Sequence, residues 1–153
     1  MVYLESKTSE ELASWLPAMK VHYIAERIKA GESTEDAHRV SEMQFGQLFP
    51  EGVLADGQHV MNIVADETTV GTLWMGRPFS GDSKTWFVFD IEIAEDFRGR
   101  GYGRAAMEAA ETWTREHGGT RVALNVFGPN VIARALYDSL GYEVQTTSMF
   151  KEL

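Results

Sequence analysis

The chain has 153 residues, enough for one domain with a sizeable core, and 44% of them are hydrophobic, as expected for a folded globular protein. Its formal net charge of −9 argues against nucleic acid as a partner, because that binding depends on lysines and arginines that neutralise phosphates. A negative surface would attract cationic amines, although acidity that serves solubility alone is the simpler explanation of the charge. The lack of cysteine excludes disulfides, thiolate metal sites and a cysteine nucleophile.

Neither a membrane span nor an export signal is visible in the sequence. No apolar run approaches the roughly 20 residues that cross a bilayer. Residues 1–7 lack the basic and apolar regions of a signal peptide. We therefore expect no membrane partner and, by default, a cytoplasmic location.

A short strand over residues 2–4 and a long helix are predicted at the start of the chain. Residues 8–11 have the form of a capping box, and apolar side chains then recur at helical spacing as far as Tyr23. Pro17 lies inside this pattern, so we expect a kink or two shorter helices. Gly31 ends the helical pattern.

A second helix is predicted to start at residues 33–36 and to stop before Pro50. The two helices carry several acidic side chains, which fit a solvated face better than a site. These side chains are Glu26, Glu32, Glu35 and Glu42.

The rest of the chain contains most of the predicted strands. Two of them form an antiparallel hairpin, and a longer turn over residues 77–84 follows it. Strands are expected over residues 59–65, 69–75, 86–93, 121–127, 142–144 and 147–151. One helix is expected to follow the glycine-rich turn after the strand 86–93 and to run to about 117, and another is expected over 130–140. The predicted fold class is therefore α/β (α+β), a single mixed, mostly antiparallel sheet flanked by helices. We expect one domain with a helical part (1–58), a sheet part (59–127) and a C-terminal part (128–153).

Residues 91–106 run from an apolar strand through a glycine-rich turn into an alanine-rich helix. Glycines at positions 99, 101 and 103 let the backbone turn tightly and approach a ligand, because they have no Cβ. The first N–H groups of the new helix lack partners and carry positive partial charge. This stretch therefore predicts a cradle for a diphosphate.

A dinucleotide-binding site is a second interpretation of this stretch. Gly101, Gly103 and Ala106 fit the loose spacing G-x-G-x-x-A. Such a fold also needs an acidic residue at the end of the next strand, where this chain has Asn125 and no carboxylate. A nucleotide-dependent oxidoreductase is therefore disfavoured.

Two motifs resemble the GNAT superfamily of N-acetyltransferases. Arg98-x-x-Gly101-x-Gly103 fits the family pattern Arg/Gln-x-x-Gly-x-Gly/Ala. Further along, Asn130 opens a predicted helix that carries Tyr137 and ends in Leu-Gly-Tyr at residues 140–142, which is similar to the other signature of that family. The two motifs cover about residues 86–144, in the order and spacing of the family.

The resemblance implies an acetyl-CoA-dependent N-acetyltransferase that needs no metal. Its acceptor would be a primary amine of a small molecule or a protein, and a homodimer is one alternative, since many relatives are dimers. With no cysteine to carry the acetyl group, transfer would occur by direct attack in a ternary complex. The resemblance assigns coenzyme binding, largely by main-chain groups, to Ile91, Ile93, Arg98, Gly99, Arg100, Gly101, Tyr102, Gly103, Arg104 and Asn130.

Tyr137 is the candidate proton donor. It follows Asn130 by about two helical turns, so the two residues share a helix face that the resemblance places toward the thioester. A phenol with a pKa near 10 can protonate a departing thiolate. A core tyrosine is the alternative for Tyr137, and a structural role is expected for Tyr142.

Glu92 and Asp90 are the candidate general bases. They lie two residues apart on a predicted strand and so share one face, which we also expect to carry Trp86 and Val88. Glu92 is preferred because it lies nearer the cradle, although an ion pair with a cradle arginine or simple exposure explains it equally well. His59, at the start of a strand, is more consistent with a surface residue.

A non-catalytic acyl-CoA-binding sensor or scaffold is the alternative function. The cradle would serve it equally well. Tyr137 and an acid near Glu92 favour the enzyme, because a pure binding domain needs neither.

Overall fold

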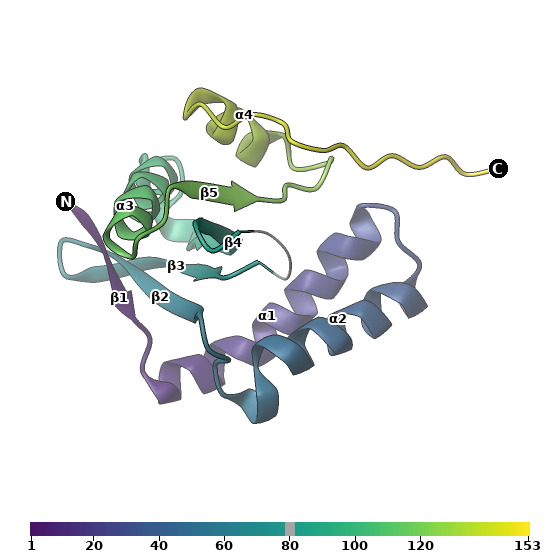
Figure 1. The fold of residues 1–153 in the computed structure, drawn as a ribbon, viewed down its shortest axis with the longest axis horizontal. Helices are drawn as coiled ribbons and strands as arrows, with labels where there is room; N and C mark the ends of the chain where they lie inside the picture. Colours follow the sequence, from purple (N-terminus) through teal and green to yellow (C-terminus); the bar gives the residue numbers. More distant parts are fainter. Residues whose placement is uncertain (79–81) are drawn as a thin grey trace.

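The computed structural model describes residues 1–78 and 82–153, and it arranges five strands in one sheet in the order β1-β2-β3-β4-β5 (Figure 1). Neighbouring strands from β1 to β4 are antiparallel, and β5 is parallel to β4. This mixed sheet confirms the predicted fold class. The strands are β1 (Val2–Ser6), β2 (Gln58–Ala65), β3 (Thr68–Gly76), β4 (Thr85–Ile93) and β5 (Arg121–Leu124).

Helices cover both faces of the sheet (Figure 1). Leu16, Phe45 and Trp74 belong to a core between the sheet and the pair α1 and α2. Met75, Met107 and Tyr137 belong to a second core on the opposite face, with α3 and α4. The helices are α1 (Ser9–Lys29), α2 (Thr34–Leu48), α3 (Tyr102–Glu116) and α4 (Val131–Ser139), with short 3₁₀ turns at Pro50–Gly52 and Glu95–Phe97.

The helix α1 begins with the predicted capping box. The Thr8 hydroxyl accepts a hydrogen bond from the Glu11 amide at 3.2 Å, and the Glu11 carboxylate accepts one from the Thr8 amide at 2.7 Å. Of the two alternatives predicted at Pro17, a division into two shorter helices is wrong, since α1 is one continuous helix. Pro17 is on the exposed side, where water can reach the carbonyl that loses its partner, while Leu12 and Leu16 hold the buried side.

A β-bulge in β4 decides which side chains face which core. Trp74 pairs with Asp90 and Met75 pairs with Val88, so Phe89 is one extra residue in β4. Val88 packs in the core beside α3, whereas Phe89 stacks on Trp74 in the core beside α1 and α2, with ring centroids 4.7 Å apart. Asp90, opposite Trp74, therefore faces α1 and α2.

This bulge overturns one expectation from the sequence. Asp90 and Glu92 share a face, as predicted, but Trp86 and Val88 point to the opposite face. Strict alternation along a strand breaks down where one extra residue is inserted.

The C-terminal segment also differs from the prediction. No strand forms over residues 142–144 or 147–151, and residues 142–153 run as an extended segment to the C-terminus (Figure 1). Residues 143–148 contain Val144 as their only large apolar side chain, so pairing with β5 would bury little apolar surface. The strand β5 is also shorter than predicted.

The remaining expectations concern the middle of the chain. The hairpin of β2 and β3 forms as predicted, around a turn in which Asp66 and Glu67 have φ of 47° and 61°. The predicted turn over 77–84 includes residues 79–81, which lie outside the described residues.

Within the described part of the chain, no helix has both the length and the apolarity of a membrane span.

Candidate active site

The cradle predicted between β4 and α3 has the geometry of an anion site. Gly99 and Gly101 have φ of 73° and 83°, and a Cβ at either position would meet no atom within 4 Å. The amides of residues 99–104 donate to no acceptor among the described residues, and the first helical bond at this end runs from Ala105 to Gly101 at 3.1 Å. A row of unpaired N–H groups at the start of a helix fits a diphosphate.

Arginine side chains tie the cradle to its neighbours. The Arg98 Nε donates to the Ile93 carbonyl at 2.8 Å, and its guanidinium lies 3.6 Å from the Glu92 carboxylate. Arg104 donates to the Ser139 hydroxyl at 2.5 Å, which joins the start of α3 to the end of α4. Arg100 lies over the Phe97 ring at 5.8 Å. The arginines thus fix the loop, and its amides remain available.

The strand β4 extends past the residues that pair it with β5. Its pairing with β5 ends at Val88 and Leu124, although β4 continues to Ile93. The Ala94 amide donates to the Val70 carbonyl at 2.9 Å, so the alternation of an antiparallel ladder turns the main chain of Ile93 and Ile91 away from β3. These two predicted coenzyme-binding residues therefore border the opening between β4 and β5.

The helix α4 carries Tyr137, whose phenol is close enough to Asp90 for the charge of that carboxyl group to act on it. Its N-cap is Asn130, whose side-chain oxygen accepts from the Ala133 amide at 3.2 Å; Asn130 itself is exposed and makes no described contact with the cradle. Tyr137 is only 7% exposed, and its ring centroid lies 5.8 Å from that of Tyr142. Burial raises the pKa of the Tyr137 phenol, and the charge of Asp90 raises it further. Tyr137 therefore stays protonated at neutral pH.

Tyr142 has the structural role expected of it. Its hydroxyl donates to the Glu111 carboxylate of α3 at 3.2 Å. This bond joins the end of α4 to α3 and leaves Tyr137 as the tyrosine at the opening.

Asp90 is the most perturbed carboxyl group at the site. Burial raises its pKa to about 7, with Glu92 and Glu26 adding to the rise and His22 opposing it. Its Oδ2 atom is shielded from solvent and has no hydrogen-bond partner among the described residues. A carboxyl group that is half ionised near neutral pH can exchange a proton with a bound amine.

Glu92, the preferred base in the sequence, is in a different environment. Its side chain is 57% exposed and pairs with Arg98. The prediction that Glu92 is the base remains a prediction, and Asp90 has the environment of a base. Distance from the cradle, on which the preference for Glu92 was based, does not reflect this difference, because the difference arises from the packing of α1 over β4.

His59 is not the surface residue that the sequence suggested. Its ring lies 4.9 Å from that of Trp113 and 5.6 Å from that of Trp86, and burial lowers its pKa. Trp86 is near the start of β4, at the end opposite the cradle. His59 therefore belongs to an aromatic cluster away from Tyr137.

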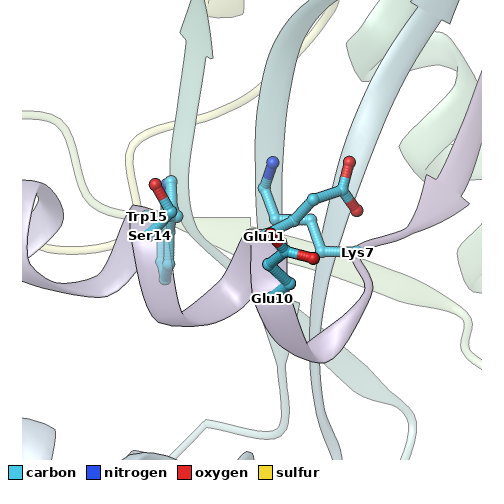
Figure 2. A pocket seen from close by; sticks show the side chains of 5 residues that line it. All are labelled: Lys7, Glu10, Glu11, Ser14 and Trp15. Carbon is cyan, nitrogen blue, oxygen red and sulfur yellow. The ribbon is translucent and has the colours of Figure 1, made fainter.

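A shallow pocket near the start of α1 is also separate from this site. Figure 2 shows the side chains that line it: Lys7, Glu10, Glu11, Ser14 and Trp15. Glu11 caps α1 and accepts from the Asn62 side chain at 3.0 Å, and Lys7 donates to the same side chain at 2.5 Å. These polar groups hold α1 to β2, and they are two strands away from β4.

Among the described residues no cluster of three or more metal-ligating side chains occurs.

Known proteins share both this fold and this sequence pattern. The family model for GNAT acetyltransferases matches residues 19–142. YycN and YdgE, two uncharacterized N-acetyltransferases of Bacillus subtilis (strain 168), are 31% and 30% identical to the chain; the alignments cover 99% of this chain and 99% of YycN, and 98% of this chain and 97% of YdgE.

Solved structures agree in fold. The crystal structure of YycN superimposes with a TM-score of 0.89 and covers 100% of this chain and 99% of its own. The aminoglycoside N-acetyltransferase AAC(6')-Iy in complex with CoA has a TM-score of 0.58 at 17% identity, over 100% of this chain and 95% of its own. At that identity the likeness shows the fold alone.

Proposed function

Because this chain belongs to the GNAT family of acetyltransferases, we propose that it moves an acetyl group from acetyl-CoA to a primary amine of a small molecule or a protein. The observation that carries this proposal is the pair of Asp90 and Tyr137 at the open edge of β4, beside a cradle of unpaired amides. The fold neighbour solved with CoA supports the choice of coenzyme.

The cradle would hold the diphosphate of the coenzyme. The amides of residues 99–104 donate to no acceptor among the described residues, and the start of α3 adds its positive partial charge. The main-chain groups of Ile91 and the Ile93 amide, which face away from β3, would pair with the pantetheine arm and polarise the acyl carbonyl, while the Ile93 carbonyl is held by Arg98. Bound acetyl-CoA supplies the acetyl group as a thioester.

Asp90 and Tyr137 would move the protons. The acceptor becomes a neutral amine by losing one proton to solvent. As its nitrogen bonds to the acetyl carbon, the Asp90 carboxylate accepts the second proton. As the carbon–sulphur bond breaks, the Tyr137 phenol donates its proton to the sulphur. The proton on Asp90 then passes to Tyr137, which returns both groups to their starting states.

A non-catalytic acyl-CoA sensor is the second candidate, and the cradle fits it equally well. The buried carboxyl of Asp90 argues against it, because a pure binding domain gains nothing from a shielded and unpaired oxygen atom.

Thiol release distinguishes the two candidates. Purified protein is incubated with acetyl-CoA and a panel of amines, and free thiol is followed over time. We expect turnover with at least one amine and loss of turnover in Tyr137→Phe. Tight CoA binding with no turnover across a broad panel would instead establish the sensor.

A further inference from the structure

The unpaired Oδ2 atom of Asp90 points to a group that the chain itself does not provide. Shielded polar atoms in folded proteins nearly always have a hydrogen-bond partner. In the described residues no donor reaches this atom, and no lysine, arginine or histidine forms an ion pair with Asp90. A bound ammonium group would supply both the donor and the charge.

Two further carboxylates, those of Glu92 and Glu26, interact electrostatically with Asp90. Glu92 follows Asp90 on the same face of β4. Glu26 comes from α1, one turn after His22, next to the positions of Met19 and Tyr23 that pack toward the sheet. The charges of both glutamates reach the Asp90 carboxyl group.

The positive groups near Asp90 are fewer than the carboxylates, and His22 of α1 acts on Asp90 electrostatically without forming an ion pair among the described residues. Arg27 forms an ion pair with Glu32 at 2.5 Å and also donates to the Tyr23 hydroxyl. Arg98 donates to the Ile93 carbonyl and also pairs with Glu92 at 3.6 Å, but both side chains are more than half exposed, so solvent weakens this pair. Among the described residues Glu26 has no ion pair. The face around Asp90 therefore carries more negative charge than the chain neutralises.

We propose that this site selects acceptors with two positive charges, one on the amine that Asp90 receives and the other on an ammonium group held by Glu26 and Glu92. The inference rests on the proposed acetyl transfer. Two residues along a strand are about 6.6 Å apart, which suits a linear diamine with a short methylene chain between its nitrogens. Glu26 and Glu92 would then determine specificity, while Asp90 receives the reacting nitrogen.

The test compares two acceptors of equal length. Diaminobutane carries the second charge, and aminobutanol has a neutral hydroxyl in its place. We expect kcat/KM for diaminobutane to exceed that for aminobutanol by about fivefold or more, the size of one partly exposed ion pair, and the excess to shrink with added salt. Glu26→Gln and Glu92→Gln should each lower this ratio.

A matched control is Glu42→Gln, which removes one exposed carboxylate from α2 and should leave the ratio as in the unmodified protein. The ratio compares two substrates of the same variant, so a partial loss of folding or of catalysis cancels. A ratio near one in the unmodified protein, or a ratio that neither glutamine variant lowers, overturns the inference while the acetyl transfer stands. Coenzyme binding without acetylation of any amine overturns the proposed function itself.

Discussion

The Asp90 carboxyl group and the Tyr137 phenol interact electrostatically although they come from opposite faces of the sheet. Asp90 faces α1 because of the bulge in β4, and Tyr137 packs in the core beside α3. The two groups lie close enough to interact because the pairing of β4 with β5 ends at Val88 and Leu124, short of Asp90. The short β5 and the bulge together create the proposed proton-transfer pair.

Tyr137→Phe should lower kcat by about 100-fold or more, since it removes the proposed donor to the leaving sulphur and keeps the ring in its core position. The dissociation constant for CoA, measured by calorimetry, should stay unchanged. Tyr142→Phe is the matched control: it loses the bond to Glu111, at a cost of about 1 kcal/mol in the free energy of unfolding, and keeps kcat. Equal activity of the two variants would remove Tyr137 from the mechanism.

The acid limb of the pH profile should identify the base. Asp90 with a pKa of about 7 must lose its proton to act, so kcat/KM should rise with pH up to about 7. In Asp90→Asn this limb should disappear and turnover should fall sharply. A limb that persists in Asp90→Asn and disappears in Glu92→Gln would instead assign the role to Glu92, as the sequence suggested.

Asp90→Asn should also make the protein more stable at alkaline pH. The pKa of Asp90 is raised by folding from 3.8 to about 7, so between these values only the folded state holds the proton. The contribution of Asp90 to the free energy of unfolding therefore falls as pH rises through this window. Urea unfolding at about pH 5 and about pH 8 should show a stabilisation by the variant that grows to a few kcal/mol at the higher pH. A difference that is independent of pH would contradict the burial of the charge.

Much of this fold could be predicted from the sequence because its signals are local. The capping box at Thr8 and the glycines of the cradle each act within a few residues, and their elements form where expected. The mixed sheet follows from the order of these elements, and the cradle follows from the glycine spacing between β4 and α3.

The parts that could not be predicted depend on contacts distant in sequence. Strict alternation along the strand predicts that Asp90 and Val88 face the same side of the sheet. In the structure Phe89 is an extra residue between them, so they face opposite sides. Pro17 predicted a break in α1, yet the packing of Leu12 and Leu16 on the sheet holds the helix together. The electrostatic effect of Glu26 on Asp90 could not be predicted, because it depends on how α1 crosses the sheet.

Gly71 tests how tightly β3 supports the site. A Cβ at this position would lie 2.2 Å from the Glu92 carbonyl, so Gly71→Ala must push β4 away from β3. We expect a loss of about 1–3 kcal/mol in the free energy of unfolding, as for other overpacked sites, together with reduced turnover because Asp90 and Glu92 shift. Gly46→Ala on α2 is the control, since a Cβ there meets no atom within 4 Å. Full turnover in a destabilised Gly71→Ala would show that the position of β4 is not critical.

Gly101→Ala separates coenzyme binding from backbone strain. Gly101 has φ of 83°, so alanine should cost about 1–2 kcal/mol in the free energy of unfolding or rotate the backbone and turn the cradle amides away from the diphosphate. Gly118, at the opposite end of α3, has φ of 73° and equally open surroundings, so Gly118→Ala carries the same strain outside the cradle. Calorimetry should show CoA binding weakened at least about tenfold in Gly101→Ala alone, since several charge-assisted hydrogen bonds are lost. Equal affinity in both variants would mean that the diphosphate binds elsewhere, because the strain is matched and only the cradle differs.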